Sequence, residues 1–149
     1  LKDLQPKSDA DEIYSVGRRV YNSICVQCHQ PNGQGNPLAF IPPLVESEWV
    51  LALEPGRLIR FVYKGLQGPL KVKGETYGQA AMFAVGDQLP GDDEAKAKQV
   101  AGVLTYIRST WGNQAPPVTL ERVKATHAKF KDRTDPWTPD ELLAIPETE

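Results

Sequence analysis

The chain has few residues that bind metals or form cross-links, since its 149 residues include two cysteines, two histidines and one methionine. No apolar run approaches the ~20 residues that a bilayer-spanning helix needs. Neither sign of charge dominates, because 17 basic residues stand against 19 acidic ones, and this balance argues against nucleic-acid binding. An apolar fraction of 40% and a charged fraction of 24% are typical of a soluble globular protein. The length predicts one domain with room for an appended tail.

Apolar residues recur at helical spacing over most of the chain, which predicts a mostly α fold. We expect helices over residues 9–25, 47–53, 55–63, 93–111 and 119–131, and a last short helix from residue 138. Weak alternation from Leu70 to Thr76, around Gly74-Glu75, predicts a small hairpin. Residues 1–8 are interpreted as a flexible arm, 9–114 as the domain, and 115–149 as a helical extension packed on it.

The chemistry is concentrated in a Cys-x-x-Cys-His run formed by Cys25, Cys28 and His29. Two thiols one helical turn apart can bond both vinyl groups of a haem while the adjacent imidazole points at the iron. A thioredoxin-like pair would need a strand and an α/β context, which the surrounding pattern lacks. Structural zinc would have to use every Cys and His of the chain, including two adjacent residues, and a plain disulfide is the third alternative. We predict one haem c attached through Cys25 and Cys28, with His29 on the iron.

A second iron ligand has two candidates. Met82 is the only methionine and lies in a small-residue segment that we expect to be a loop, where a thioether can close over one haem face. An ordinary core methionine is the alternative. His127 is the rival ligand, because Leu120, Val123, His127 and Phe130 share one helical stripe. We favour Met82, and we interpret His127 as a packed histidine.

Several segments together carry a family resemblance. They are Gly17-x-x-x-Tyr21-x-x-x-Cys25-x-x-Cys28-His29, Gly33-Gln34-Gly35, Pro42-Pro43-Leu44, Gly65-Leu66-Gln67-Gly68-Pro69, Gly74-Glu75-Thr76-Tyr77, Met82 and the run from Leu104 to Asn113. The chain resembles a class I monohaem cytochrome c over roughly residues 11–113. It is most similar to the cytochrome domains associated with bacterial quinoprotein alcohol and sugar dehydrogenases. The resemblance implies helices packed around one covalently bound haem, with a small hairpin and a C-terminal helical extension.

The resemblance also implies roles for single residues. The carbonyl of Pro42 or Pro43 would accept a hydrogen bond from Nδ1 of His29, and we choose Pro42. Tyr77 would supply a hydroxyl near the Met82 sulfur, with a surface hairpin tyrosine as the alternative. Phe83 stands where the family usually has proline after the methionine, which removes a fixed backbone angle. Gly17 would let the first and last core helices cross closely.

The function implied is electron transfer by an iron with two axial ligands, so the chain is expected to be a carrier and not an enzyme. One alternative is the electron-accepting domain of a larger quinoprotein dehydrogenase, and another is a haem enzyme or gas sensor with an open iron position. Expected partners are redox proteins: a quinoprotein dehydrogenase, and a terminal oxidase or another cytochrome. Neither nucleic acid nor a membrane span is expected. Haem attachment implies a periplasmic or extracytoplasmic location. The basic residues within 54–75 suggest a charged docking patch with steep salt dependence.

Overall fold

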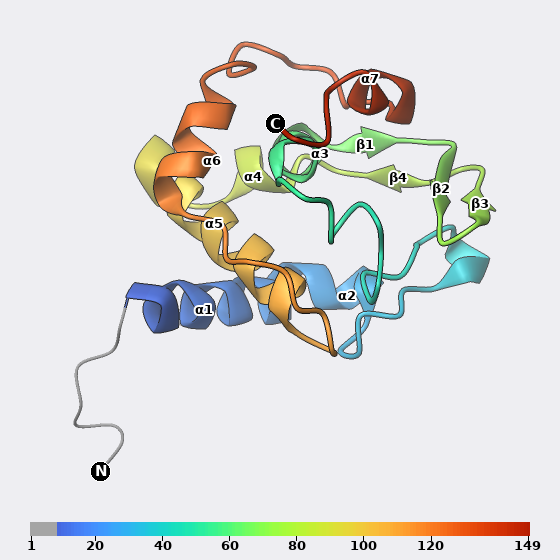
Figure 1. The fold of residues 1–149 in the computed structure, drawn as a ribbon, viewed down its shortest axis with the longest axis horizontal. Helices are drawn as coiled ribbons and strands as arrows, with labels where there is room; N and C mark the ends of the chain where they lie inside the picture. Colours follow the sequence, from blue (N-terminus) through green and yellow to red (C-terminus); the bar gives the residue numbers. More distant parts are fainter. Residues whose placement is uncertain (1–8) are drawn as a thin grey trace.

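A computed structural model describes residues 9–149, which form a mainly helical body with two short antiparallel strand pairs (Figure 1). The helices are α1 (Asp9–Val20), α2 (Val26–His29), α3 (Gly56–Lys64), α4 (Val85–Gln88), α5 (Asp93–Ser109), α6 (Leu120–His127) and α7 (Pro139–Leu143). The strands are β1 (Leu66–Gln67), β2 (Leu70–Val72), β3 (Glu75–Tyr77) and β4 (Ala81–Met82). The mostly α fold with a small hairpin is confirmed. The predicted arm at residues 1–8 lies outside the described residues.

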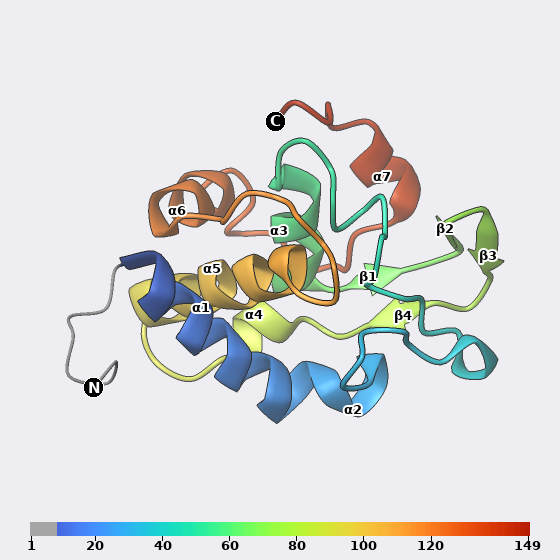
Figure 2. The ribbon, with the colours of Figure 1, turned by 60° about the horizontal axis from the view of Figure 1, so that its bottom comes forward.

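Helix α5 is the centre of the fold, with α1 on one side of it and α3 and α6 on the other (Figure 2). Its start is fixed by Asp92, whose side chain accepts a hydrogen bond from the Ala95 amide at 2.8 Å. Helix α1 crosses α5 where two glycines meet. A Cβ atom placed on Gly17 would lie 1.8 Å from the carbonyl oxygen of Gly102. The close crossing expected at Gly17 is therefore confirmed, and Gly102 supplies the second small residue that it needs.

The strands form two separate pairs. Hairpin β2–β3 turns at Lys73 and Gly74, whose φ angles of 53° and 83° are those of a two-residue type I′ turn. The expected hairpin is confirmed, with its turn one residue earlier than predicted. Strands β1 and β4 pair outside this hairpin, with Leu66 opposite Met82. Met82 thus lies in a strand where we expected a loop, because two-residue strands leave no periodicity to detect.

The helix predicted over residues 47–53 is wrong, because this segment consists of turns. The hydroxyl of Ser47 accepts a hydrogen bond from the Trp49 amide at 3.2 Å, which favours a turn over a helix. Nη1 of Arg108 donates to the carbonyls of Val50 and Ala52 at 2.9 and 3.0 Å. These carbonyls are held by a buried guanidinium from α5, so long-range contacts decide the local conformation.

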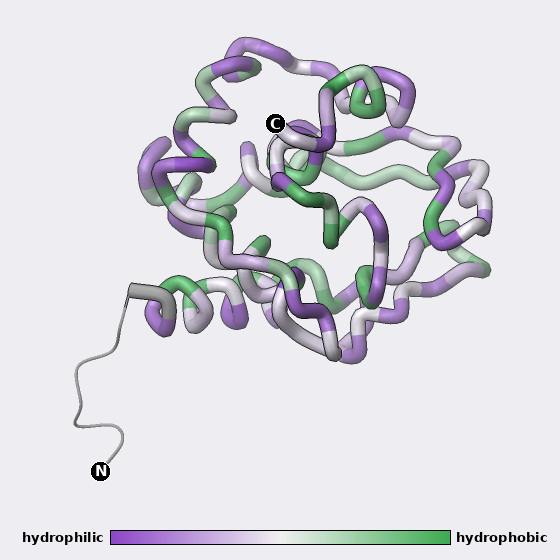
Figure 3. Tube along the Cα trace, in the orientation of Figure 1, coloured by the Kyte–Doolittle hydropathy of each residue, from purple (hydrophilic) through white to green (hydrophobic). Residues whose placement is uncertain are grey.

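The C-terminal extension shares the core of the domain. Threonines cap α6 and α7, as Thr119 and Thr138 accept hydrogen bonds from the amides three residues later. Helix α6 ends at His127, earlier than the predicted residue 131, because the chain tightens into three-residue turns there. The connection between α6 and α7 is mostly hydrophilic (Figure 3). Five residues of the extension are nevertheless buried in the common core: Val118, Val123, Phe130, Trp137 and Leu142.

Candidate functional site

The Cys-x-x-Cys-His run lies at the end of the first helix, where a π-helical segment, Tyr21–Cys25, joins α1 to α2. Cys25 is half-buried, Cys28 is exposed, and no disulfide joins them. Burial, with a smaller contribution from Cys28, raises the pKa of the Cys25 thiol to about 12. The hydroxyl of Tyr21 donates to the carbonyl of Gln30, which ties the segment after the run back to the helix before it. The run is thus presented on a fixed helical turn.

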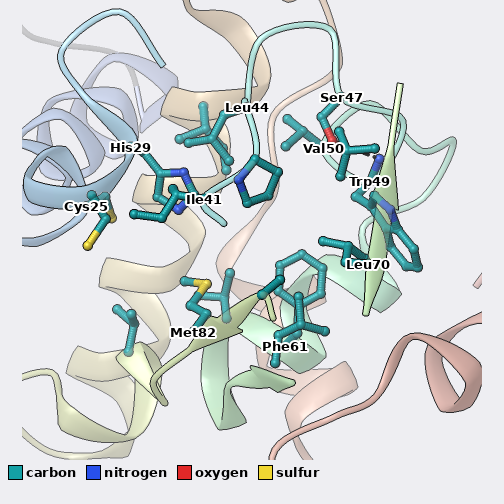
Figure 4. A pocket seen from close by; sticks show the side chains of 18 of the residues that line it. Cys25, His29, Ile41, Leu44, Ser47, Trp49, Val50, Phe61, Leu70 and Met82 are labelled. Carbon is teal, nitrogen blue, oxygen red and sulfur yellow. Dashed lines mark hydrogen bonds between the residues drawn. The ribbon is translucent and has the colours of Figure 1, made fainter. Parts of the chain in front are cut away.

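This turn forms one wall of a cavity of about 240 Å³. Apolar side chains line most of it, with contributions from α3, β1, β2, β4 and α5. The side chains with polar or sulfur atoms are few: Cys25, Cys28, His29, Ser47, Trp49 and Met82. Figure 4 shows Cys25, His29 and Met82 at the same cavity, although they come from different elements. An apolar cavity with two thiols at its edge fits a planar, mostly apolar group that is bound through thioether bonds.

His29 is the residue of this cavity best suited to bind a metal ion. Burial lowers the pKa of its imidazole, and the carbonyl of Pro42 raises it by a smaller amount, so the ring is neutral at neutral pH. Its buried Nδ1 atom completes no hydrogen bond within residues 9–149. The Pro42 carbonyl therefore lies near the ring without completing a hydrogen bond to Nδ1 in this conformation. A neutral imidazole beside a carbonyl acceptor is the form that binds iron.

A tight loop brings Pro42 to His29. Gly35 donates its amide proton to the His29 carbonyl at 3.0 Å, and its φ of 69° is in the left-handed region. A Cβ atom at Gly35 would lie 2.5 Å from the carbonyl oxygens of both Ile41 and Pro42. Only glycine therefore lets the loop fold back on itself here. The sequence pointed to Pro42 through the resemblance, and the loop geometry gives the physical reason for its nearness.

Met82 reaches the cavity from β4, opposite Leu66 of β1. Gly65, just before β1, has a φ of 91°, and a Cβ atom there would lie 2.6 Å from the Met82 carbonyl oxygen. Tyr77 behaves differently. It is buried in the core with only 8% of its surface exposed, so a surface tyrosine is wrong, but it is not among the residues that line the described cavity. Its hydroxyl near the Met82 sulfur stays a prediction.

His127 lies away from the cavity. Its ring stacks on Tyr63 with 4.2 Å between ring centroids, and it contacts Phe130 edge-on. Burial, followed by the charge of Lys64, lowers the pKa of His127. Within residues 9–149, the cavity wall that holds His29 does not include it. The packed histidine that we expected is the arrangement seen.

Sequence reasoning missed several parts of the wall. Leu58, Phe61 and Val62 of α3 face the cavity, and so do Val103, Leu104 and Ile107 of α5. Their helical spacing indicated a buried face but could not say that the face lines a cavity. Trp49 also lines it, and its Nε1 donates to the Lys71 carbonyl at 2.9 Å, which links the 47–53 turns to β2.

The basic residues within 54–75 do not form one exposed patch. Only 6% of the Arg60 side chain is exposed, and it pairs with Glu149 at 3.5 Å. Lys64, with 7% exposed, pairs with Asp87 at 3.0 Å. Nε of Arg57 donates to the Ile145 carbonyl at 2.8 Å. These charges hold α3 against α4 and the C-terminal extension, so Arg60 and Lys64 do not belong to an exposed docking patch. Lys71 and Lys73 are the exposed basic residues of the stretch.

The sequence model of the family described as Cytochrome c matches residues 14–111, which span the motif, the cavity wall and α5. The chain belongs to the cytochrome c family. It is 37% identical over 136 residues to cytochrome c-552 of Thermus thermophilus, covering 86% of this chain and 92% of that protein. It is 30% identical over 118 residues to the fructose dehydrogenase cytochrome subunit of Gluconobacter japonicus, covering 77% and 22%. The cytochrome c subunit of a quinone alcohol dehydrogenase from Komagataeibacter europaeus is 32% identical over 101 residues, covering 67% and 19%.

Family membership settles the cofactor and the class of function. The chain binds one haem c, attached covalently through Cys25 and Cys28. Cytochromes c of this family transfer electrons, so the chain is an electron carrier and not an enzyme, and its partners are redox proteins. No helix within residues 9–149 has both the length and the apolar character needed to cross a bilayer.

Proposed function

We propose that this cytochrome carries electrons with His29 and Met82 as the two axial ligands of its haem iron. The observation that supports the ligand pair is their convergence: the imidazole of α2 and the thioether of β4 line one apolar cavity (Figure 4). The haem supplies the one-electron couple, and the chain's residues supply ligation, orientation and exclusion of water. A thioether favours the ferrous state relative to a second imidazole, so the potential is expected on the higher side.

The protein side of the mechanism rests on rigidity. The Pro42 carbonyl lies beside the His29 ring, and a hydrogen bond from Nδ1 to it would orient the neutral imidazole so that Nε2 could hold the iron. Apolar walls from α3 and α5 keep water from the metal, so a change of one charge meets little solvent rearrangement. With both positions on the iron held by side chains of the chain, no site would remain there for a substrate.

We propose a quinoprotein dehydrogenase as one electron donor and a terminal oxidase or another cytochrome as acceptor. Similarity to cytochrome subunits of a fructose dehydrogenase and a quinone alcohol dehydrogenase supports the donor. A periplasmic or extracytoplasmic location follows from the chemistry of covalent haem attachment, which takes place outside the cytoplasmic membrane in bacteria.

The cavity rim indicates where electrons leave. Phe40 and Phe83 line the cavity and have 40% and 53% of their surfaces exposed. Leu38, in the short 3₁₀-helix Pro37–Ala39 that Phe40 follows, is 94% exposed. Ala39 and Ala81 add further exposed, uncharged lining. We propose that partners approach through this apolar rim.

Met82 can be tested directly. Met82→Leu keeps the side-chain volume and removes the sulfur, and Met82→Ala also opens space. In both variants we expect the ferric protein to lose the weak sulfur-to-iron charge-transfer band at the red edge of the visible spectrum. The midpoint potential should fall, and cyanide should bind at once.

Phe83→Ala is the matched control, because Phe83 is the next residue and also lines the cavity. It should keep the charge-transfer band. A wild-type protein without the band, which binds cyanide immediately, would refute the ligation by Met82 while leaving the covalent haem intact.

A further inference from the structure

Trp137, in the C-terminal extension, contacts strand β1, which is the strand that pairs with Met82 of β4. Its amide donates to the carbonyl of Gly65 at 2.9 Å, and its carbonyl accepts from the amide of Gln67 at 2.9 Å. These two bonds form a parallel bridge between Trp137 and Leu66. Leu66 pairs on its other side with Met82. Strand β1 is therefore held between the extension and the proposed ligand strand, which lie on its two edges.

The extension holds Trp137 in place with a compact brace. The Arg133 guanidinium lies 3.7 Å from the centroid of the Trp137 ring. The same guanidinium donates to the carbonyls of Asp135 and Pro136 at 2.9 and 2.8 Å, and to both carboxylate oxygens of Glu141 at 2.9 and 2.7 Å. Such a two-pronged pair is geometrically specific. The turn that presents the Trp137 backbone to β1 is thus fixed by its own side chains.

The ring of Trp137 anchors this turn in the core. Only 9% of its surface is exposed, and it meets Phe130 edge-on with 5.9 Å between centroids. Arg60 of α3 also lies 5.9 Å from the ring centroid. Removal of the ring would therefore release the backbone bridge to β1 without altering any residue of the cavity wall.

Strand β4 is only two residues long, and an isolated pair of strands is marginally stable at best in water. Beside its pairing with β1, the Gly68 amide donates to the carbonyl of Ala80, the residue before β4, at 2.6 Å. The bridge from Trp137 on the other edge of β1 adds backbone hydrogen bonds that hold the pair in place. Gly65 lets β4 approach closely, because a side chain there would meet the Met82 carbonyl. Because Met82 pairs with Leu66, a shift of β1 would also shift Met82 relative to the cavity.

We propose that Trp137 is a positioning residue that keeps the Met82 sulfur at the haem iron by holding strand β1 in place. This inference rests on the proposed ligation by Met82. It gives the C-terminal extension a role at the iron in addition to its packing, since loosening of the extension would favour dissociation of Met82.

Cyanide binding to the ferric holoprotein measures that dissociation, because cyanide can bind only when Met82 has left the iron. The net effect of one hydrogen bond on an opening equilibrium is about fivefold, and the bridge contains two such bonds, so loosening both in part is expected to give about tenfold. We expect Trp137→Ala to bind cyanide about tenfold faster than wild type at subsaturating cyanide, with a weakened charge-transfer band and a lower midpoint potential. Trp137→Phe keeps a packed ring, and the Nε1 atom that it loses is buried without a partner within residues 9–149. It should restore the wild-type rate.

Val123→Ala is the matched control for general loosening of the extension. Val123 is fully buried in α6 and is not part of the backbone bridge to β1. It should lower stability against denaturant but leave the cyanide rate at the wild-type value. Equal cyanide rates in Trp137→Ala and Val123→Ala, at equal loss of stability, would overturn the positioning role.

Met82→Ala separates this proposal from the ligation itself. If Met82→Ala binds cyanide at the wild-type rate, the ligation is refuted and the positioning role falls with it. If Met82→Ala binds at once and Trp137→Ala does not differ from Val123→Ala, only the positioning role fails. Should Trp137→Ala not fold, Glu141→Gln weakens the brace from an exposed position. It should raise the cyanide rate in the same direction by about twofold, and an unchanged rate would overturn the proposal.

Discussion

The crossing of α1 and α5 gives a sharp test of how this fold is held together. Substitution Gly17→Ala would place a methyl carbon 1.8 Å from the Gly102 carbonyl oxygen and 2.3 Å from its carbonyl carbon. Ordinary contact begins near 3.4 Å, so the two backbones must separate by about 1.6 Å at the crossing, the difference between these distances. Neither side has a flexible side chain that could move instead.

The size of the effect follows from two opposing contributions. Overpacking costs about 1–3 kcal/mol, and contact between two backbones belongs at the upper end of that range. Alanine in place of glycine within a helix returns about 1 kcal/mol. We therefore expect Gly17→Ala to lower the free energy of unfolding by about 2 kcal/mol, which corresponds to roughly 4–8 °C in the melting temperature for a chain of this size.

Gly102→Ala is less severe, because its nearest neighbours are the Gly17 amide nitrogen at 2.8 Å and the Ile13 carbonyl oxygen at 2.9 Å. Gly78→Ala is the control, since no atom lies within 4 Å of the added carbon and the residue is exposed. It should change stability by less than about 0.5 kcal/mol.

Denaturant unfolding of the haem-bearing protein measures all three variants, because the covalent bonds keep the haem on the unfolded chain. The expected order of destabilisation is Gly17→Ala, then Gly102→Ala, then Gly78→Ala. A Gly17→Ala protein as stable as the Gly78→Ala protein would refute the close crossing as the geometry of this fold.

Two further predictions concern charge. Arg60 and Lys64 are buried in ion pairs and the cavity rim is uncharged. The rate of electron exchange with a redox partner should therefore change less than about threefold between low and physiological salt, where the Debye length shrinks from ~30 Å to ~8 Å. Stopped-flow mixing measures this rate, and a steep salt dependence would contradict docking by the apolar rim. Hydrogen bonds from Arg133 lower the pKa of Glu141 below its unfolded value of 4.5, and those from Lys129 lower the pKa of Glu149. Both carboxylates therefore stabilise the fold above about pH 4.5 and lose that contribution as the pH falls through their folded pKa values, so Glu141→Gln should flatten the acid branch of stability against pH.

Local patterns carried much of what the sequence could show. The Cys-x-x-Cys-His run needs only neighbours in sequence, and α5 has both a complete apolar stripe and a capping aspartate. Likewise, Thr138 and Glu141 form a capping box that the sequence displays directly. These features depend on contacts within one turn of helix, where sequence rules are strongest.

Long-range contacts account for what the sequence did not show. The turns at 47–53 follow from Arg108, more than fifty residues away, which takes carbonyls that a helix would use. Met82 belongs to a strand only because Leu66 lies beside it. Arg60 and Lys64 of the basic stretch are buried in ion pairs with Glu149 and Asp87, and periodicity cannot identify such partners. Each case is decided by a residue on another element.

The two sides of the cavity therefore differ in how they are held. His29 follows a continuous helical path from α1, which α5 locks at the glycine crossing, and the Gly35 loop closes over it. Met82 stands on a two-residue strand whose support passes through β1 to Trp137, near the end of the chain. Local opening begins where few contacts hold the backbone. On the proposed ligation by Met82, ligand exchange at the iron is expected to start on the Met82 side, and on the proposed role of Trp137 firmer packing of the C-terminal extension would slow it.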